Sequence, residues 1–254
     1  MTLRPPEGLQ ATKANDASRH RVVLRAAAAE LGVVLADTTI DALLQYVALM
    51  LQWNRVYNLT ALRDPDEMLS HHLMDCVAIL PALQRHAAGA RPRILDVGSG
   101  GGLPGVVIAI VRPDWEVTCV DAVAKKASFI RQVGAVLGLR NLHPVHARVE
   151  ALGSRPKRGE GLELDSGVSA EPGRDLGFDL ITSRAFASLS DFVALTRRHL
   201  ACGGVWLAMK GKTPNDEIAA LTNGVEVFHV EQVDVPGLEA QRCLVWLRPE
   251  SQAT

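Results

Sequence analysis

The sequence predicts an α/β fold, with a mostly parallel seven-stranded sheet that has an antiparallel edge strand, preceded by a small all-helical N-terminal region. Two observations predict it. From residue 91 onward, short apolar and β-branched runs alternate with helical stretches, which is typical of a parallel sheet covered by helices on both faces. Before that point only helical periodicity is present. We therefore expect a helical region over residues 20–90 and a second domain over residues 91–250.

The N-terminal region is expected to hold three helices, over residues 21–30, about 38–51 and 65–83. The first is Ala-rich, a composition that favours helix, and Gly32 would end it. Asp37 or Thr38 suits the N-cap of the second, which has apolar residues at i, i+3 and i+4 spacing. Residues 1–19 are polar and show no period, so we expect a disordered or loosely ordered tail there.

The second domain is expected to hold strands over residues 93–97, 116–121, 142–147, 179–183, 205–210, 225–231 and 242–247. Its helices are expected over residues 104–111, 125–137, 189–200 and 214–221. Only a turn region around Pro236 separates the last two strands, so we expect them to form an antiparallel pair at one edge of the sheet. Residues 153–177 are rich in glycine and charge, and we interpret them as a surface insertion.

We expect a protein of the cytoplasm that acts as a monomer, and composition bears on its partners. The chain has 27 basic and 28 acidic residues, so a contact with nucleic acid must come from a local basic patch rather than from the overall charge. It has no secretory signal at its start and no apolar run approaching the ~20 residues that span a bilayer. The four cysteines are scattered without metal-binding spacing, so we expect reduced thiols, no metal and no membrane contact.

The most informative segment is the glycine-rich stretch at residues 94–105, which follows a predicted strand and opens a predicted helix. Glycine is required where the backbone takes a positive φ or approaches a ligand without a Cβ in the way. The spacing Gly100-x-Gly102-x-x-Gly105 formally matches the dinucleotide fingerprint. That interpretation predicts an NAD-dependent oxidoreductase, which calorimetry with each cofactor would separate from a methyltransferase.

Charged residues at the ends of successive strands favour a different ligand. Asp96 stands two positions before Gly98, where a carboxylate would repel a pyrophosphate but suits the cationic amino acid moiety of S-adenosylmethionine. Asp121 ends the next strand, where it can accept hydrogen bonds from both ribose hydroxyls. Glu150 follows the third strand near the expected adenine edge, and Arg184 ends the fourth at the carboxyl edge of the sheet. The sequence therefore predicts a binding site for S-adenosylmethionine along this edge.

Several stretches of the chain resemble the glucose-inhibited division protein B family, bacterial methyltransferases that modify the N7 atom of a guanine in small-subunit ribosomal RNA. The resemblance lies in residues 53–60, 64–69, 72–75, 96–105, 131–133, 148–150, 183–188 and 209–211, in the family's order. Of these, the pairing of Asn58-Leu-Thr60 with Ser183-Arg-Ala-Phe-Ala-Ser188 is specific to the family, whereas the glycine loop is shared by many methyltransferases. The resemblance implies a class I S-adenosylmethionine-dependent, Rossmann-like methyltransferase fold. It also implies 16S ribosomal RNA, or the 30S particle, as the partner.

The resemblance implies a set of site residues, to which the general features of the fold add several more. The predicted cofactor-binding residues are Asp96, Gly98, Gly100, Gly102, Leu103, Asp121, Val149, Glu150 and Arg184. The residues predicted to position the substrate are Arg184, Lys210, Phe186, Asn58 and His72. Lys210 ends the fifth predicted strand, where it would contact an RNA phosphate, and Phe186 could stack on a base.

The chemistry of guanine N7 agrees with a site that has no acid–base pair. N7 carries a free in-plane lone pair, so attack on a sulfonium methyl group requires no proton removal, and we expect catalysis by positioning. The product would be S-adenosylhomocysteine. The sequence lacks the Asn/Asp-Pro-Pro-aromatic motif of amino-group methyltransferases and the Pro-Cys nucleophile of cytosine C5 enzymes. A small-molecule methyltransferase on the same fold remains the alternative.

Overall fold

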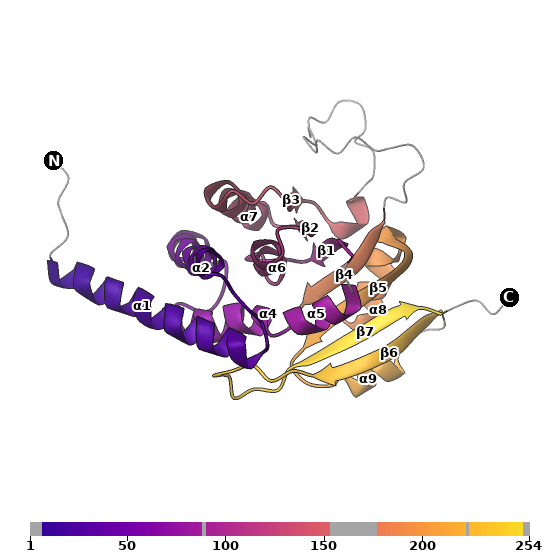
Figure 1. Cartoon of the computed structure of the whole chain (residues 1–254). Helices are drawn as coiled ribbons and strands as arrows, with labels where there is room; N and C mark the ends of the chain where they lie inside the picture. Colours follow the sequence, from indigo (N-terminus) through magenta and orange to yellow (C-terminus); the bar gives the residue numbers. More distant parts are fainter. Residues whose placement is uncertain (1–6, 88–89, 153–176, 222–223, 251–254) are drawn as a thin grey trace, which may run out of the picture.

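The computed structural model describes residues 7–87, 90–152, 177–221 and 224–250 (Figure 1). Its centre is a seven-stranded sheet in the order β3-β2-β1-β4-β5-β7-β6. The strands are β1 Arg93–Val97, β2 Glu116–Asp121, β3 Leu142–His146, β4 Phe178–Arg184, β5 Leu200–Lys210, β6 Val225–Gln232 and β7 Cys243–Pro249. Strands β1 to β5 pair in parallel, and β7 runs antiparallel between β5 and β6. The predicted fold class is confirmed, with the antiparallel strand lying one position inside the edge.

Helices cover both faces of this sheet because strand residues alternate between two cores. The helices packed on the sheet are α6 Gly105–Val111, α7 Ala124–Leu137 and α8 Leu189–Thr196; α2 Asp37–Tyr57 packs on α6 and α7, and α9 Asn215–Ala219 packs on α8. Ile94 belongs to the core that contains α2, α6 and α7, whereas its neighbour Leu95 belongs to the opposite core with α8 (Figure 1). The strand order reverses between β1 and β4, so the carboxyl ends of these strands form the crevice where doubly wound folds bind ligands.

The N-terminal helices share the core of the α6–α7 face and are part of the same body. Their first helix, α1 Glu7–Glu30, is longer than predicted. The expectation of a loose tail over residues 1–19 is wrong from Glu7 onward, because helix formation depends on backbone hydrogen bonds and good helix formers and does not require an apolar period. Helix α2 reaches the sheet's ligand edge, where the Tyr46 hydroxyl donates a hydrogen bond to the backbone C=O of Gly101 at 2.6 Å.

The helix predicted over residues 65–83 is broken. The chain forms α3 Pro65–Met68, a π-helical turn Leu69–Met74, α4 Asp75–Val77 and then α5 Leu80–Ala87. The wider π turn is compatible with the apolar period because Leu69, Leu73 and Met74 remain buried. It occurs beside the candidate site, where such turns are frequent, and His71 and His72 both border the cavity there.

Other predicted bounds differ from the structure too, most of all the end of α2, which was expected at about residue 51 and lies at Tyr57, the end of α8 and the start of β5. The helix predicted over residues 189–200 ends at Thr196, whose Oγ1 accepts a hydrogen bond from Nε1 of Trp206 at 2.9 Å, and a 3₁₀ turn follows. Strand β5 begins at Leu200 because Leu200 pairs with Phe178 across a bulge in the ladder. The insertion predicted over residues 153–177 lies outside the described residues except for Gly177.

Candidate functional site

The loop between β1 and α6 contains three glycines with a left-handed backbone. The angle φ is +65° at Gly98, +58° at Gly100 and +89° at Gly102, a conformation that residues with a Cβ rarely adopt. At two of these glycines there is also no room for a Cβ atom. A Cβ at Gly98 would lie 2.5 Å from Cδ2 of Phe186, and one at Gly102 would lie 2.4 Å from Cγ2 of Val106. The loop therefore needs glycine at Gly98 and Gly102 for both conformation and packing, and at Gly100 for conformation.

Asp96 lies beneath this loop and is fully buried. Its Oδ2 accepts a hydrogen bond from the backbone N–H of Gly105 at 3.0 Å, and its backbone C=O accepts one from Oγ of Ser99 at 2.8 Å. Its Oδ1 is buried without a hydrogen-bond partner among the described residues. Asp96 lines neither of the two cavities at this edge of the sheet. This differs from the predicted contact with a ligand amine, since the carboxylate binds the start of α6 and fixes the loop from below.

The buried Asp96 carboxyl makes the stability of the fold depend on pH. Burial raises its pKa from 3.8 to about 7. The folded protein thus binds this proton more tightly than the unfolded chain, so stability that is present below about pH 4 is lost as the pH rises to about 7. Relative to the unaltered protein, we expect Asp96→Asn to gain up to about 4 kcal/mol of unfolding free energy across that range. Urea unfolding at several pH values measures this gain, and parallel pH profiles would contradict it.

One cavity, of about 390 Å³, lies at the carboxyl ends of β1, β2 and β3. Its lining includes Gly98, Asp121, Val149, Glu150 and Phe186. The Asp121 carboxylate accepts backbone hydrogen bonds from Gly100 at 2.9 Å and from Val123 at 2.8 Å, and each oxygen keeps a lone pair for a further donor. Val149 is buried and Glu150 is exposed at the rim. The cavity thus presents two carboxylates around an apolar wall.

A second cavity, of about 600 Å³, adjoins the first and shares Gly98, Lys126 and Ala185 with it. Its lining includes the predicted residues His72, Gly98, Gly100, Leu103, Arg184 and Lys210. It also includes Thr60, Asp75 and Arg242, which come from the N-terminal region and from the start of β7. Ala185, between the two cavities, has a φ of +51°, an unfavourable conformation for a residue with a Cβ. Such backbone conformations cluster at functional sites.

Asp75 holds two arginines over the second cavity. It is only 4% exposed, and its Oδ2 accepts a hydrogen bond from Nη1 of Arg184 at 3.2 Å while its Oδ1 accepts one from Nε of Arg242 at 2.7 Å. Sequence reasoning assigned no role to Asp75 or Arg242. One signal was present, because Asp75 is a charged residue within the apolar face of a predicted helix, where an acid is rarely buried unless it is paired.

His72 is neutral near pH 7 and belongs to the same polar cluster. Burial, followed by the neighbouring Arg184 guanidinium, lowers the pKa of its imidazole to about 4. Its Nε2 lies 2.7 Å from Oγ1 of Thr60, and its Nδ1 lies 3.4 Å from Nη2 of Arg184. Thr60 is held in turn by Asn54, whose Oδ1 accepts its backbone N–H at 3.0 Å. Both imidazole nitrogens are thus engaged, and a group with this pKa is a weak base.

Comparison with known proteins assigns the chain to a family. The sequence profile described as rRNA small subunit methyltransferase G (GidB) matches residues 39–245. A protein named ribosomal RNA small subunit methyltransferase G from Acidovorax sp. is 55% identical over 234 residues, covering 89% of this chain and 94% of that protein. The chain belongs to the rRNA small subunit methyltransferase G family. A relative of the same name from Leptothrix cholodnii is 54% identical over 234 residues, covering 92% of this chain and 98% of that protein.

Membership of the rRNA small subunit methyltransferase G family confirms the predicted resemblance, the enzyme class and the use of S-adenosylmethionine. Among solved structures, a SAM-dependent methyltransferase from Aquifex aeolicus aligns with a TM-score of 0.48 and 16% identity, covering 75% of this chain and 96% of that one. The fold assignment stands on the strand order and the helix layers rather than on this likeness.

The residues of the first cavity fit the cofactor of a methyltransferase G. Asp121 offers carboxylate lone pairs at the end of β2, and Glu150 offers a second acceptor after β3. The bare backbone of Gly98 forms a wall that a Cβ would obstruct. Gly102 lines neither cavity and instead packs against α6, so its part is to shape the loop.

Two residues predicted to position the substrate of the methyltransferase lie elsewhere. Asn58 ends α2 in a left-handed conformation, is exposed, and accepts a hydrogen bond from Nη2 of Arg63 at 3.1 Å. It borders neither cavity, whereas the buried Asn54, one turn earlier, organises this part of the wall. Phe186 lines the first cavity and packs edge-on against Phe192 at 6.4 Å between centroids, which places it on the cofactor side.

Lys210 borders the second cavity, but its charge is already paired. Its Nζ donates to both carboxylate oxygens of Glu217, at 3.0 and 2.8 Å, and to the backbone C=O of Ala187 at 3.0 Å. Glu217 also accepts the backbone N–H of Leu189 at 2.8 Å. Three donors meet three acceptors, so the predicted phosphate contact is not supported. Lys210 instead fastens the segment between β4 and α8 to α9.

This pairing predicts how Lys210→Ala affects the methyltransferase. We expect a loss in kcat of about tenfold, because the segment that directly follows Arg184 is no longer fixed. The deficit should be the same at about 50 and 200 mM salt, since no phosphate contact is lost. Glu217→Gln, which keeps the side chain's shape but removes its charge, should show a deficit of the same kind. Steady-state kinetics measures both variants, and a deficit that shrinks as salt rises would restore the phosphate contact.

Proposed function

We propose that this protein transfers a methyl group from S-adenosylmethionine to N7 of a guanine in 16S ribosomal RNA, leaving S-adenosylhomocysteine. One observation carries the proposal. A carboxylate-lined cavity and an arginine-lined cavity adjoin at Gly98 and Ala185, so a cofactor in the first and a base in the second would meet at that wall. The family of the chain supports ribosomal RNA of the small subunit as the substrate.

S-adenosylmethionine, when bound, supplies an electrophilic methyl group on a sulfonium centre. Asp121 would accept hydrogen bonds from the ribose hydroxyls, and Glu150 would meet the adenine edge. The loop from Gly98 to Leu103 would bound the methionine moiety. Arg184 and Arg242, both held by Asp75, donate hydrogen bonds toward acceptors on the guanine or its phosphates. The positions of these side chains around the two cavities support the proposed roles.

The side chains of the second cavity support transfer by positioning. A nucleophile with a free lone pair needs alignment at near-contact distance and no proton acceptor, and alignment of this kind can supply about 7–11 kcal/mol of the barrier. His72 is the imidazole nearest to Arg184, and its low pKa and two engaged nitrogens suit a structural part rather than a general base. The reaction is therefore expected to show no bell-shaped pH dependence from His72.

The expected surroundings of the enzyme follow from its substrate. We infer that it works in the cytoplasm as a monomer, on free rRNA or on the 30S particle. No helix in the described parts of the chain combines the length and apolar character needed to span a bilayer. Within the same residues, no three or more His, Cys, Asp and Glu side chains gather closely enough to hold a metal ion.

Mapping of modified nucleotides tests the proposal. Purified protein, S-adenosylmethionine with a labelled methyl group and unmethylated small-subunit particles should give one labelled 7-methylguanine, located by nuclease digestion and mass spectrometry. Ribosomal RNA from cells that lack the gene should lose the same modification. Label on an exocyclic amine, on a ring carbon or on a small molecule would overturn the assignment.

A further inference from the structure

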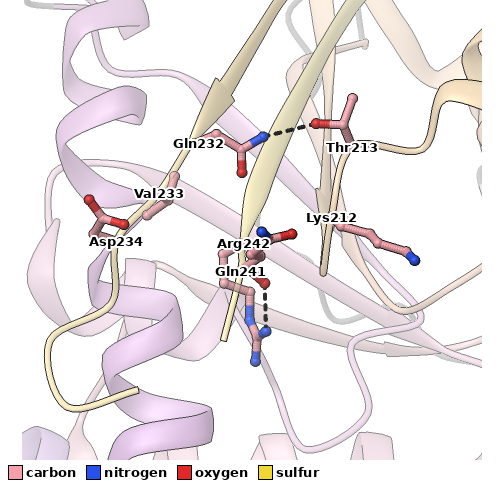
Figure 2. A pocket seen from close by; sticks show the side chains of 7 residues that line it. All are labelled: Lys212, Thr213, Gln232, Val233, Asp234, Gln241 and Arg242. Atoms are coloured by element: carbon pink, nitrogen blue, oxygen red, sulfur yellow. Dashed lines mark hydrogen bonds between the residues drawn. The ribbon is translucent and has the colours of Figure 1, made fainter. Parts of the chain in front are cut away.

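A third cavity lies beside the methyl-transfer site, between the end of β5 and the segment that joins β6 to β7. It has a volume of about 460 Å³, within the range of sites that hold small ligands. We call it the hairpin pocket; the polar side chains that line it are Lys212, Thr213, Gln232, Asp234, Gln241 and Arg242 (Figure 2). Neither the cofactor nor the target base accounts for this group of side chains.

The hairpin pocket is continuous with the cavity proposed for the guanine. Arg242 borders both of them. Lys210 and Gly211 line the guanine cavity, and Lys212, the next residue along the chain, lines the hairpin pocket. Because consecutive Cα atoms are about 3.8 Å apart, the two hollows are direct neighbours. A chain of nucleotides that places one base in the guanine cavity therefore has the hairpin pocket directly beside that base.

Part of the pocket is held rigidly. The Arg242 guanidinium is fixed by the Asp75 carboxylate at 2.7 Å and by the backbone C=O of Gln241 at 2.9 Å. Across the pocket, Nε2 of Gln232 donates to Oγ1 of Thr213 at 2.9 Å, and Figure 2 shows that these residues come from both sides of the hollow. Fixed polar groups of this kind reduce the entropy lost when a ligand binds.

The remaining groups are available to a ligand. Lys212, Asp234 and the side chain of Gln241 are exposed and have no hydrogen-bond partner in the described part of the chain. An ammonium group suits a phosphate, whereas an amide and a carboxylate suit the edge of a base, with the carboxylate accepting from an exocyclic amino group. A carboxylate would repel a phosphate placed deep in the pocket, so the phosphate belongs at Lys212 and the base beside Asp234.

We propose that the hairpin pocket binds a nucleotide that flanks the target guanine in a single-stranded segment of the ribosomal RNA, with Lys212 on its phosphate and Gln241 and Asp234 on its base. This inference rests on the proposed rRNA methyltransferase function and adds a specificity site to it. Single-stranded segments are the form in which proteins read RNA bases, because the base edges are then accessible.

Kinetics with small-subunit particles at two salt concentrations tests the inference. Lys212→Ala should raise the KM for the particle about tenfold at ~50 mM salt and about fourfold at ~200 mM, since loss of one phosphate contact to a single strand lowers the salt slope by ~0.7. Gln241→Ala should raise it about fivefold at both concentrations, the loss of a base contact worth ~1 kcal/mol. The KM for S-adenosylmethionine and kcat should stay within about twofold of the unaltered enzyme.

Arg248→Ala is the matched control, because it removes an exposed cation from β7, where Arg248 pairs with Glu226, away from the pocket. Its KM for the particle should be unchanged. If Lys212→Ala and Gln241→Ala both leave that KM unchanged while the unaltered enzyme methylates the particle, the inference is overturned and the proposed function stands. If the unaltered enzyme transfers no methyl group to the particle, both are overturned.

Discussion

Gly98→Arg is expected to abolish binding of S-adenosylhomocysteine, with a loss in affinity of about 100-fold or more, equivalent to ~2.8 kcal/mol. Two effects add at this position. The backbone has a φ of +65°, which costs a residue with a Cβ about 1–2 kcal/mol. The new side chain would also begin 2.5 Å from the Phe186 ring and extend from a wall that both cavities share. Titration calorimetry with S-adenosylhomocysteine measures the result.

Gly138→Arg is the matched control for this substitution. Gly138 ends α7 with a φ of +67°, so the backbone penalty is nearly the same, but a Cβ there meets no atom within 4 Å. We expect this variant to lose a little stability and to bind the ligand normally. An affinity of Gly98→Arg within threefold of the control would refute the assignment of the cofactor cavity.

Asp75→Ala is expected to destabilise the fold by about 3–5 kcal/mol, because it leaves the Arg184 and Arg242 guanidinium groups half-buried without their shared counter-charge. Asp66→Ala is the control, since Asp66 is also an acid of the N-terminal region with an arginine partner, but its side chain is 55% exposed. Exposed pairs contribute at most about 1 kcal/mol. Urea unfolding measures the loss of unfolding free energy in each variant, and equal losses would contradict a stabilising role for the two ion pairs of Asp75.

A conservative variant separates the positioning of the arginines from stability. Asp75→Asn keeps the shape of the side chain and can still accept a hydrogen bond, so we expect it to fold. Its kcat should fall about 10- to 100-fold while the KM for S-adenosylmethionine stays unchanged, because small displacements of groups that align the reactants are costly. A normal kcat would show that the ion pairs of Asp75 support the fold and do not position the two arginines for catalysis.

Local signals in the sequence were sufficient for the sheet and the glycine loop. In β1 the alternation of Ile94 and Leu95 between two cores follows from the period of a strand, which is set by the backbone alone. The need for glycine at positions 98 and 100 likewise arises from their own φ values. Prediction failed where a local rule has an exception, as in α1, which forms without an apolar period, and at the π turn of Leu69–Met74.

Among the site residues, too, local signals predicted position along the sheet edge but not the partners of the side chains. Asp121 and Glu150 were predicted because each comes at the end of a strand or shortly after one. The structure brings both to the lining of one cavity, because the carboxyl ends of parallel strands meet at one edge of the sheet. The same rule predicted that Lys210 lies at this edge, where it does lie, but not that its ammonium group pairs with Glu217 of α9. A position at the edge of a sheet identifies a neighbourhood and does not tell whether a charge there is free.

By itself, then, the sequence determined the order of the strands and helices, the conformation of the glycine loop and the class of ligand, because each depends on residues near one another in the chain or on the family they resemble. Only the tertiary structure decided which charged side chains form ion pairs with one another. Asp75 meets Arg184 across 109 positions and Arg242 across 167. The physical reason is that a hydrogen bond acts over about 3 Å, and no local pattern records which distant side chains folding brings within that reach.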